Sequence, residues 1–419
     1  TDGDGNATIV NDDDINFANS TVRGDLIATA TTSHITDTGT LTITGAAKFI
    51  TTAAGSNIEL DTSDNAFASE VTMQAGNGSN VAFGNIAFVD SEAVKLHTSA
   101  GTNGDLFIDA NTNGVAAVGG SLSITAKSGN ITQSLPVTVG TTSSFTTSAN
   151  NTTITLSNTS NAFTGALTIT TNDDSNDRSY ATIDGGTTAL IIATSTIDGN
   201  LTLISGAAAG ITDTGNVTVA GNLVATTNAN SGVINMGTLE VNGTIALTTH
   251  GDGDATIVND DEIDFANSTV RGNLAATATT GNIIDTGVLT ISGTSTFTTS
   301  QSNDDITLGS VNVLTGAVTL NTSGSTGHAV VDNGTTALII AASTVGGDLT
   351  LTSGAAAGIT DSGAVSVAGN LVATTDDNDG VIDMGTLEVN GTIALTTDGS
   401  GNATVVNDTQ IDFANSTVR

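Results

Sequence analysis

Apolar and polar residues alternate in short segments along the whole chain. Leu349 and Leu351 flank a threonine, and Val365 and Val367 flank a serine. A period of two is typical of a β-strand that buries one face and exposes the other. No stretch shows the i, i+3, i+4, i+7 apolar spacing of an amphipathic helix over three turns. The pattern therefore predicts an all-β chain.

These segments recur at a regular spacing. Each begins with glycine, a polar residue and then the alternating apolar residues, and the predicted strand starts are Leu201, Leu223, Ile245, Leu274, Ser295, Val318 and Leu349. The two longest steps follow Ile245 and Val318. A unit this short cannot bury a core alone, so successive units must stack. We expect a right-handed parallel β-helix of about 17 turns, each of roughly 21–31 residues, with strands about 4.8 Å apart.

The alternation also assigns residues to the inside and to the corners of this solenoid. We expect Leu349, Leu371, Ile393, Val367 and Val389 inside and Gly347, Gly369 and Gly391 at corners. The two longest steps imply loops or extra strands that interrupt a uniform repeat. The step after Ile245 holds 252–254 and 259–262, which we expect to be exposed because an unpaired buried carboxylate is costly.

Longer repeats lie above the short one. Segment 187–192 returns at 335–340 and segment 265–271 returns at 413–419, both with the same 148-residue offset. Segment 397–419 matches segment 1–23 at most positions. We interpret 1–419 as one continuous solenoid segment. In it the 148-residue block 201–348 is partly repeated at 349–419, and 1–23 is repeated at 249–271 and 397–419. Tandem immunoglobulin-like domains would instead repeat at about 100 residues.

Composition and charge narrow the function. There are 42 Asp and Glu against 7 Lys and Arg, a net charge of −35. Nucleic-acid binding needs a basic surface, and anionic lipid would repel this chain. There is no cysteine and no apolar run of about 18 residues, so we expect neither disulfides nor membrane insertion. The chain starts at Thr1 without a signal peptide, so we expect a piece of a longer polypeptide.

Three phrases carry a family resemblance. They are Ile35-Thr-Asp-Thr-Gly-Thr-Leu-Thr-Ile-Thr-Gly45, Gly129-Asn-Ile-Thr-Gln-Ser-Leu135 and Asp361-Ser-Gly-Ala-Val-Ser-Val-Ala-Gly369. This pattern of short repeats covers essentially the whole chain. It resembles the shaft repeats of filamentous-haemagglutinin-type exoproteins of two-partner secretion. The resemblance implies a right-handed parallel β-helix and export by an outer-membrane secretion partner. It also implies a place on the bacterial surface, in adhesion, biofilm or a surface fibre.

Acidic loops are the candidate metal sites, because Ca²⁺ prefers several carboxylate and carbonyl oxygens. The main candidates are Asp2, Asp4, Asp12, Asp252, Asp260 and Asp408, beside the groups Asp13 and Asp14; Asp173, Asp174 and Asp177; and Asp376, Asp377 and Asp379. Of the acidic positions compared among the three copies of 1–23, only that of Asp12 stays acidic in each. A solvated acidic face is the alternative to a Ca²⁺ site. No EF-hand loop occurs.

Each copy of 1–23 also ends in the same block, Phe-Ala-Asn-Ser-Thr-Val-Arg. We expect its phenylalanines, Phe17, Phe265 and Phe413, to fill the core at one corner. The arginines are Arg23, Arg271 and Arg419. They could bind a ligand, but we favour ion pairs with Asp12, Asp260, Asp408 or an acidic neighbouring turn, since cations are scarce in this chain.

Catalysis finds little support in the sequence. Glycosidases need two carboxylates in one fixed geometry, whereas the acidic residues here are scattered by repetition. The four histidines, His34, His97, His250 and His328, lie far apart in the sequence, and no phosphate loop or Ser/His/Asp spacing occurs. We predict a non-enzymatic, extracellular structural filament or shaft that assembles with itself or within a longer parent chain. The alternative is an adhesin that binds glycans or receptors through loops near 252–262 and 321–335.

Overall fold

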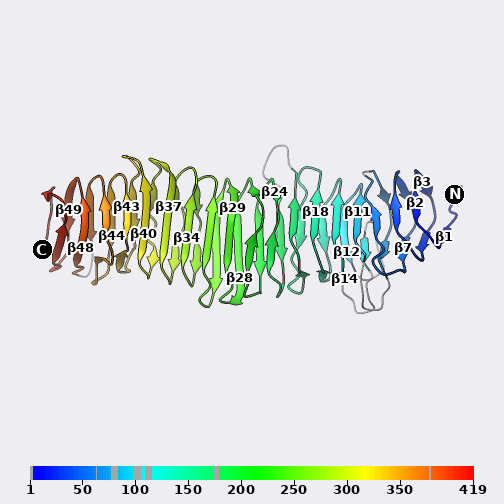
Figure 1. Cartoon of the computed structure of the whole chain (residues 1–419), viewed down its shortest axis with the longest axis horizontal. Coiled ribbons are helices and arrows are strands. Elements are labelled where there is room, and N and C mark those ends of the chain that lie inside the picture. Colours follow the sequence, from blue (N-terminus) through cyan, green and yellow to red (C-terminus); the bar gives the residue numbers. More distant parts are fainter. Residues whose placement is uncertain are drawn as a thin grey trace. The chain divides into compact units, whose positions relative to one another are not determined.

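A computed structural model describes residues 3–62, 64–76, 84–97, 105–108, 116–172, 179–376 and 379–419. These residues contain strands and turns but no helix, and parallel strands stack into a β-solenoid of about 17 turns, which confirms the predicted all-β class. The chain divides into two compact units, Thr1–Ala207 with Ile211–Gly221 and Ala208–Gly210 with Asn222–Arg419. The rungs of each unit can be followed by their labels in Figure 1.

The strands of the first unit are short. They are β1 (Ala7–Asn11), β2 (Ile15–Phe17), β3 (Ser20–Val22), β4 (Leu26–Ala30), β5 (Ile35–Asp37), β6 (Leu41–Ile43), β7 (Ala47–Thr51), β8 (Ile58–Leu60), β9 (Ala66–Phe67), β10 (Val71–Gln74), β11 (Ile86–Asp90), β12 (Val94–His97), β13 (Asp105–Ile108), β14 (Ala116–Val118), β15 (Leu122–Ala126), β16 (Ile131–Gln133), β17 (Val137–Val139), β18 (Ser143–Thr147), β19 (Ile154–Leu156), β20 (Ala162–Phe163), β21 (Leu167–Thr170), β22 (Ala181–Asp184), β23 (Leu190–Ile192), β24 (Ser195–Ile197), β25 (Leu201–Ser205), β26 (Ile211–Asp213) and β27 (Val217–Val219). Its first turns contain three strands each: β1, β4 and β7 stack in one sheet, β2, β5 and β8 in a second, and β3, β6 and β9 in a third.

The second unit continues the same style. Its strands are β28 (Leu223–Asn230), β29 (Ile234–Val241), β30 (Thr244–His250), β31 (Ala255–Asn259), β32 (Ile263–Phe265), β33 (Ser268–Val270), β34 (Leu274–Ala278), β35 (Ile283–Asp285), β36 (Leu289–Ile291), β37 (Ser295–Ser302), β38 (Ile306–Leu308), β39 (Val313–Leu314), β40 (Val318–Ser323), β41 (Ala329–Asp332), β42 (Leu338–Ile340), β43 (Ser343–Val345), β44 (Leu349–Ser353), β45 (Ile359–Asp361), β46 (Val365–Val367), β47 (Leu371–Thr375), β48 (Ile382–Val389), β49 (Thr392–Thr396), β50 (Ala403–Asn407) and β51 (Asp412–Phe413). Six of the predicted strand starts are the first residues of strands, and Ile245 is the second residue of β30.

Alternate side chains of these strands fill the interior. The five residues predicted to lie inside, Leu349, Leu371, Ile393, Val367 and Val389, are all fully buried, which confirms that prediction. In-register pairing stacks like residues in columns, as Leu349 pairs with Leu371 and Leu371 with Ile393. Burying a side chain of this size contributes roughly 1.5–3 kcal/mol.

Glycines form the corners next to these strands. The N–H of Gly369 donates to Gly347 O, and the N–H of Gly391 donates to Gly369 O, both at 2.9 Å. A Cβ atom at Gly369 would lie 2.3 Å from Asp348 Oδ1, so only glycine lets the turns approach this closely.

The long steps of the sequence contain extra strands that change the faces of the solenoid. Strand β31 starts at Ala255 and pairs with β29 and β34, whereas β41 starts at Ala329 and pairs with β38 and β44 in the other sheet. Strand β50 starts at Ala403, after an equal interval, and returns to the sheet of β31. The strand that begins with this recurring alanine therefore alternates between the two sheets from one copy to the next. Two such intervals make the 148-residue repeat seen in the sequence. The prediction that Asn259 is exposed is wrong, because it is the last inward-facing residue of β31 and is fully buried.

Candidate functional site

Asn and Asp side chains link successive turns at the corners. In the second unit the acceptors Asn282 Oδ1, Asp305 Oδ1, His328 Nδ1, Asp348 Oδ1 and Asn370 Oδ1 each bind the main-chain N–H of the equivalent residue one turn later, at 2.7–2.9 Å. We call this series the corner ladder. It ends on the N–H of Thr392. Because every bond runs from one turn to the next, the corner ladder adds side-chain support to the main-chain pairing of the sheets.

Histidines act as acceptors in such ladders. His328 Nδ1 accepts the N–H of Asp348 at 2.8 Å, and His34 Nδ1 accepts the N–H of Asn57 at 2.9 Å. Each bond requires an unprotonated Nδ1, so the ring proton lies on Nε2. His328 Nδ1 also lies 3.7 Å from Asp348 Oδ2. His250 Nδ1 contacts Thr227 O at 3.0 Å, and the side chain of His97 lies outside the described residues.

The aspartate of the Ile-Thr-Asp phrase caps the following turn. Asp361 Oδ1 accepts the N–H of Gly385 at 2.9 Å, and its Oδ2 accepts the N–H of Thr386 at 2.7 Å. Asp285 Oδ1 likewise accepts the N–H of Gly309 at 2.8 Å. Partial burial raises the pKa of Asp285 above its ordinary value although its hydrogen bonds oppose the change. The aspartate in these phrases therefore has a structural role, because its carboxylate accepts main-chain N–H groups of the next turn that would otherwise be unpaired.

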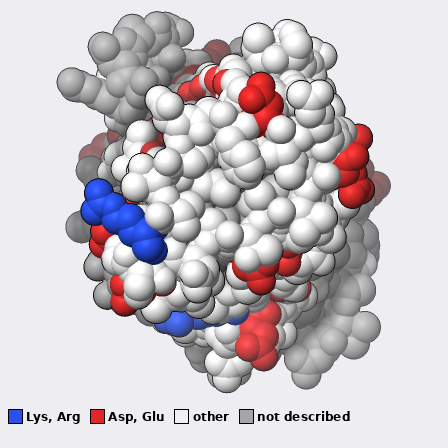
Figure 2. Space-filling view, turned by 90° about the vertical axis from the view of Figure 1, so that its left-hand side faces the viewer, with Lys and Arg blue, Asp and Glu red and all other residues white. Residues whose placement is uncertain are grey.

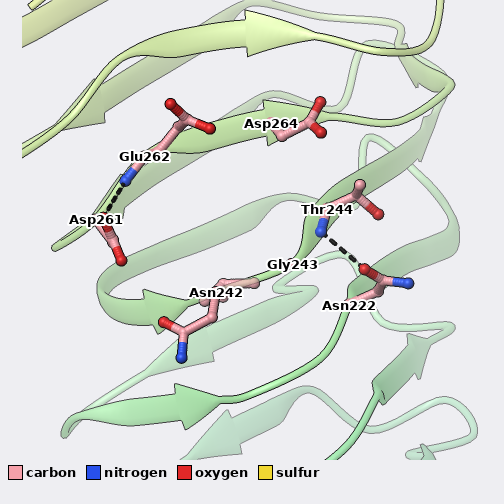
Figure 3. A pocket seen from close by; sticks show the side chains of 8 residues that line it. Asn222, Asn242, Gly243, Thr244, Asp261, Glu262 and Asp264 are labelled. Atoms are coloured by element: carbon pink, nitrogen blue, oxygen red, sulfur yellow. Dashed lines mark hydrogen bonds between the residues drawn. The ribbon is translucent and has the colours of Figure 1, made fainter. Parts of the chain in front are cut away.

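An acidic depression of about 160 Å³ lies at the turns that lead into the paired strands β30 and β32 (Figure 3). Its carboxylates come from Asp261, Glu262 and Asp264, opposite Asn222 and Thr244. These carboxylates already have partners. Asp264 Oδ1 accepts Thr286 N–H at 3.1 Å, Glu262 Oε2 accepts Asn282 Nδ2 at 3.2 Å, and Asp261 Oδ1 accepts Glu262 N–H at 2.8 Å. The depression can favour a cationic group by charge, but it offers no free set of ligands.

The described carboxylates of the Ca²⁺ hypothesis lie apart at the surface. Asp4, Asp12, Asp252, Asp260 and Asp408 are exposed, and Asp260 Oδ1 accepts a hydrogen bond from Thr279. Within the described ranges, no three or more His, Cys, Asp or Glu side chains are grouped so as to hold a metal ion. Asp2, Asp173, Asp174, Asp177 and Asp377 lie outside the described residues.

Neighbouring acidic positions have local partners. Ser33 Oγ and His34 N–H donate to Asp14 and hold its pKa below the ordinary value. Asp379 Oδ1 accepts the N–H of Ser400 at 2.7 Å. Seen from the end drawn in Figure 2, acidic side chains form separate patches on a mostly uncharged surface.

The three copies of the block Phe-Ala-Asn-Ser-Thr-Val-Arg lie in different environments. Phe265 is fully buried and Phe17 nearly so, whereas Phe413, in β51 of the last turn, is 56% exposed. The core position expected for this block is seen at Phe17 and Phe265. Phe265 packs edge-on against Phe297 at 6.3 Å between ring centroids.

The arginines of this block do not pair with carboxylates. Arg23, Arg271 and Arg419 are exposed, and none of them forms an ion pair within the described part of the chain. The main-chain N–H of Arg271 donates to buried Thr249 Oγ1 at 2.9 Å, and Arg419 N–H does the same to Thr397. The expected ion pairs are therefore wrong: an exposed pair gains little in water, and the contact shared by these two copies is made by the backbone.

Buried asparagines are the structural residues that the sequence prediction missed. Asn259, Asn333 and Asn407 occupy equivalent positions at or just after the ends of β31, β41 and β50; the first two are fully buried, and Asn407 is partly exposed. Asn333 Oδ1 accepts the N–H of Leu314 at 2.7 Å, while its Nδ2 donates to Leu314 O at 3.0 Å. The side-chain amide thus makes with Leu314 the pair of hydrogen bonds that a neighbouring strand would make through its main chain. The recurring segment Ala-x-(Ile/Val)-x-Asn was visible in the sequence, at 255–259, 329–333 and 403–407.

Comparison with known proteins gives one family match. A family model described as repeats of unknown function matches residues 4–74, 103–170, 252–321 and 326–382. The matches that begin at 252 and 326 are separated by the same interval at which the solenoid changes faces. No curated protein and no solved structure matches the chain. In the described residues, no helix is long and apolar enough to cross a membrane.

Proposed function

We propose that this chain, which belongs to the DUF5649 family of repeats of unknown function, is a non-enzymatic structural module, the shaft of an extracellular bacterial fibre. In this role the protein bears load and holds other parts of a longer assembly at a distance. The proposal extends to attachment at the cell surface and to export by an outer-membrane partner, as the resemblance to filamentous-haemagglutinin-type exoproteins implies.

The observation that carries this proposal is the bonding between successive turns. Each rung of the corner ladder adds one side-chain bond along the direction of stacking, parallel to the main-chain bonds of the sheets. Most of the inward side chains are apolar and fully buried. A repeat protein is held by its nearest-neighbour interfaces, so strong interfaces in every turn favour a stiff module over a hinged one.

Electron microscopy of the purified chain tests the proposal most directly. A shaft should give particles of uniform width, and aligned samples should diffract with a meridional spacing of about 4.8 Å. Stretching single molecules in an optical trap should require high force and release one turn or block at a time. Separate beads joined by flexible segments, or unfolding at low force without steps, would contradict a load-bearing role.

The acidic depression favours adhesion as a second candidate function. Two of its lining residues, Asp261 and Glu262, belong to the region 252–262 that the sequence predicts to carry adhesive contacts. Together with Asp264 they would attract protonated amino groups of a glycan or receptor. A glycan array with the wild-type chain and the triple variant Asp261→Asn, Glu262→Gln, Asp264→Asn tests this role. Binding that is lost in the variant would support adhesion. Absence of binding by the wild type would contradict adhesion and leave the shaft as the only proposed role.

A further inference from the structure

The position of the buried asparagines is occupied by a carboxylic acid in one segment. Asp90 ends β11 in the first unit as Asn259 ends β31 in the second, and both side chains are buried, at 1% and 0% exposure. The equivalent asparagines satisfy both halves of the amide. Asn259 Oδ1 accepts Val241 N–H at 2.8 Å, and Nδ2 donates to Val241 O at 3.1 Å.

Asp90 cannot reproduce this pairing when it is ionised. Its Oδ1 accepts the N–H of Phe67 and the N–H of Glu92, each at a long 3.4 Å. Its Oδ2 is buried and has no hydrogen-bond partner, and a carboxylate has no counterpart of the Nδ2 that donates in Asn259. A carboxylate accepts only, whereas a protonated carboxyl group donates one hydrogen bond as the amide does.

The surroundings of Asp90 mark this place as a joint. The third sheet of the first unit, β3–β6–β9, has no described strand beyond β9, the strand that contains Phe67. A depression of about 90 Å³ lies beside it, lined in part by Phe67, Ser91 and Glu92. The depression is therefore lined by the two residues that follow Asp90 in the chain and by Phe67, whose N–H is bound to its carboxyl group.

We infer that Asp90 makes the joint between β9 and β11 pH-responsive, tight when its carboxyl group is protonated and weakened when it is ionised. Burial, the main cause, raises the pKa of Asp90 to about 6. The inference concerns regulation of stiffness in the solenoid and does not depend on the proposed shaft role.

Neighbouring charges do not replace the missing donor. The main-chain N–H of Glu92 lowers the pKa of Asp90, and the negative charge of the Glu92 side chain, a smaller effect, raises it. Packed strands contribute Glu59 and Asp61 from the β8 turn and Lys127 after β15; Asp37 of β5 is bonded to Asn65 at 2.5 Å. Lys127 reaches Asp90 through its main-chain N–H, at 2.9 Å to Asp90 O, and its ammonium group forms no ion pair in the described part of the chain.

The sign of the effect follows from linkage. A carboxyl group with a raised folded-state pKa gives stability that is present below its unfolded pKa and is lost as pH rises through about 6. Between about pH 5 and about pH 8 the opening equilibrium of the joint should increase about tenfold. Hydrogen exchange measured by mass spectrometry on the whole chain can report this locally, at β9 and β11, after correction for the intrinsic pH dependence of exchange.

Reciprocal variants make the test specific. Asp90→Asn restores the amide and should abolish the pH dependence of protection at β9 and β11. Asn259→Asp creates the same buried acid in the second unit and should introduce a pH-dependent opening at β29 and β31. Equal protection of wild-type β9 and β11 at both pH values would overturn the inference, as would an unchanged pH dependence in Asp90→Asn. If Asn259→Asp fails to fold, the wild-type and Asp90→Asn profiles still decide.

Discussion

Asn370 Oδ1 accepts the main-chain N–H of Thr392, one turn further along the chain, at 2.8 Å. The same oxygen accepts the hydroxyl of Thr392 at 2.9 Å. Removing it with Asn370→Ala leaves a corner amide to water, and we expect a loss of about 1 kcal/mol in the free energy of unfolding, measured by urea denaturation. Thr392→Val is the control, because it removes only the hydroxyl bond to Asn370 Oδ1 and keeps the main-chain one, and it should cost less; equal losses would mean that the bond to the main-chain N–H is not what matters.

A larger loss is expected inside the solenoid at Asn333. The change Asn333→Leu keeps the approximate size of the side chain but leaves the N–H and C=O of Leu314 without the amide. An unsatisfied buried polar group costs about 1–3 kcal/mol, and two are created here, so we expect about 3 kcal/mol in urea denaturation. The matched control is Asn235→Leu, an exposed position of β29, which should change stability by less than about 0.5 kcal/mol. A loss at Asn333 no larger than at Asn235 would contradict the interior role.

Alternation along the strands allows the core to be predicted from the sequence. Leu349 and Leu371 can be placed inside because a period of two fixes which face each side chain occupies. Asn259 obeys the same rule, since Ala255, Ile257 and Asn259 all point inward. The prediction that it lies outside gives polarity more weight than periodicity. The rule that buried polar groups are hydrogen-bonded does not say where partners lie, and the partner of Asn259 is in another turn.

Features that depend on pairing between turns cannot be predicted in the same way. The equal spacing of Ala255, Ala329 and Ala403 is present in the sequence, but the change of face requires knowing that β31 and β41 belong to different sheets. The ion pair predicted for Arg271 rests on charge balance alone, although an exposed guanidinium group gains little from one. The acidic depression near Asp261 arises from the approach of two turns, so no local motif indicates it.

Buried threonines close the loops at the ends of long strands. Thr322 Oγ1 donates to Gly327 O at 2.6 Å and accepts the N–H of Gly346 at 3.1 Å. Thr322→Val preserves the shape and removes both bonds, so we expect a loss of about 2 kcal/mol and faster hydrogen exchange at Gly346. Thr319→Val, on the outward face of the same strand, is the control and should be nearly neutral. Unchanged exchange at Gly346 in Thr322→Val would show that the loop is held by other contacts.

One glycine should tolerate no side chain. Gly358 has φ +63°, and a Cβ atom there would lie 1.8 Å from Val381 O. Gly358→Ala should therefore destabilise the second unit by about 3 kcal/mol, through backbone strain and overpacking. Gly385→Ala is the matched control, since a Cβ atom there meets nothing within 4 Å. Thermal denaturation should separate the two variants, and similar melting temperatures would mean that the turn at Gly358 can shift without cost.

The net charge of −35 should make stability depend on salt but not on the identity of the divalent cation. Exposed carboxylates repel one another, and the Debye length falls from about 30 Å at 0.01 M to about 3 Å at 1 M ionic strength. Added NaCl should therefore raise the melting temperature. Without a described group of three carboxylates to coordinate an ion, Ca²⁺ and Mg²⁺ at equal ionic strength should raise it equally. A larger effect of Ca²⁺ that saturates at low concentration would instead establish a dedicated site. The variants Asp12→Asn and Asp260→Asn would then show whether these two equivalent acidic positions supply its ligands.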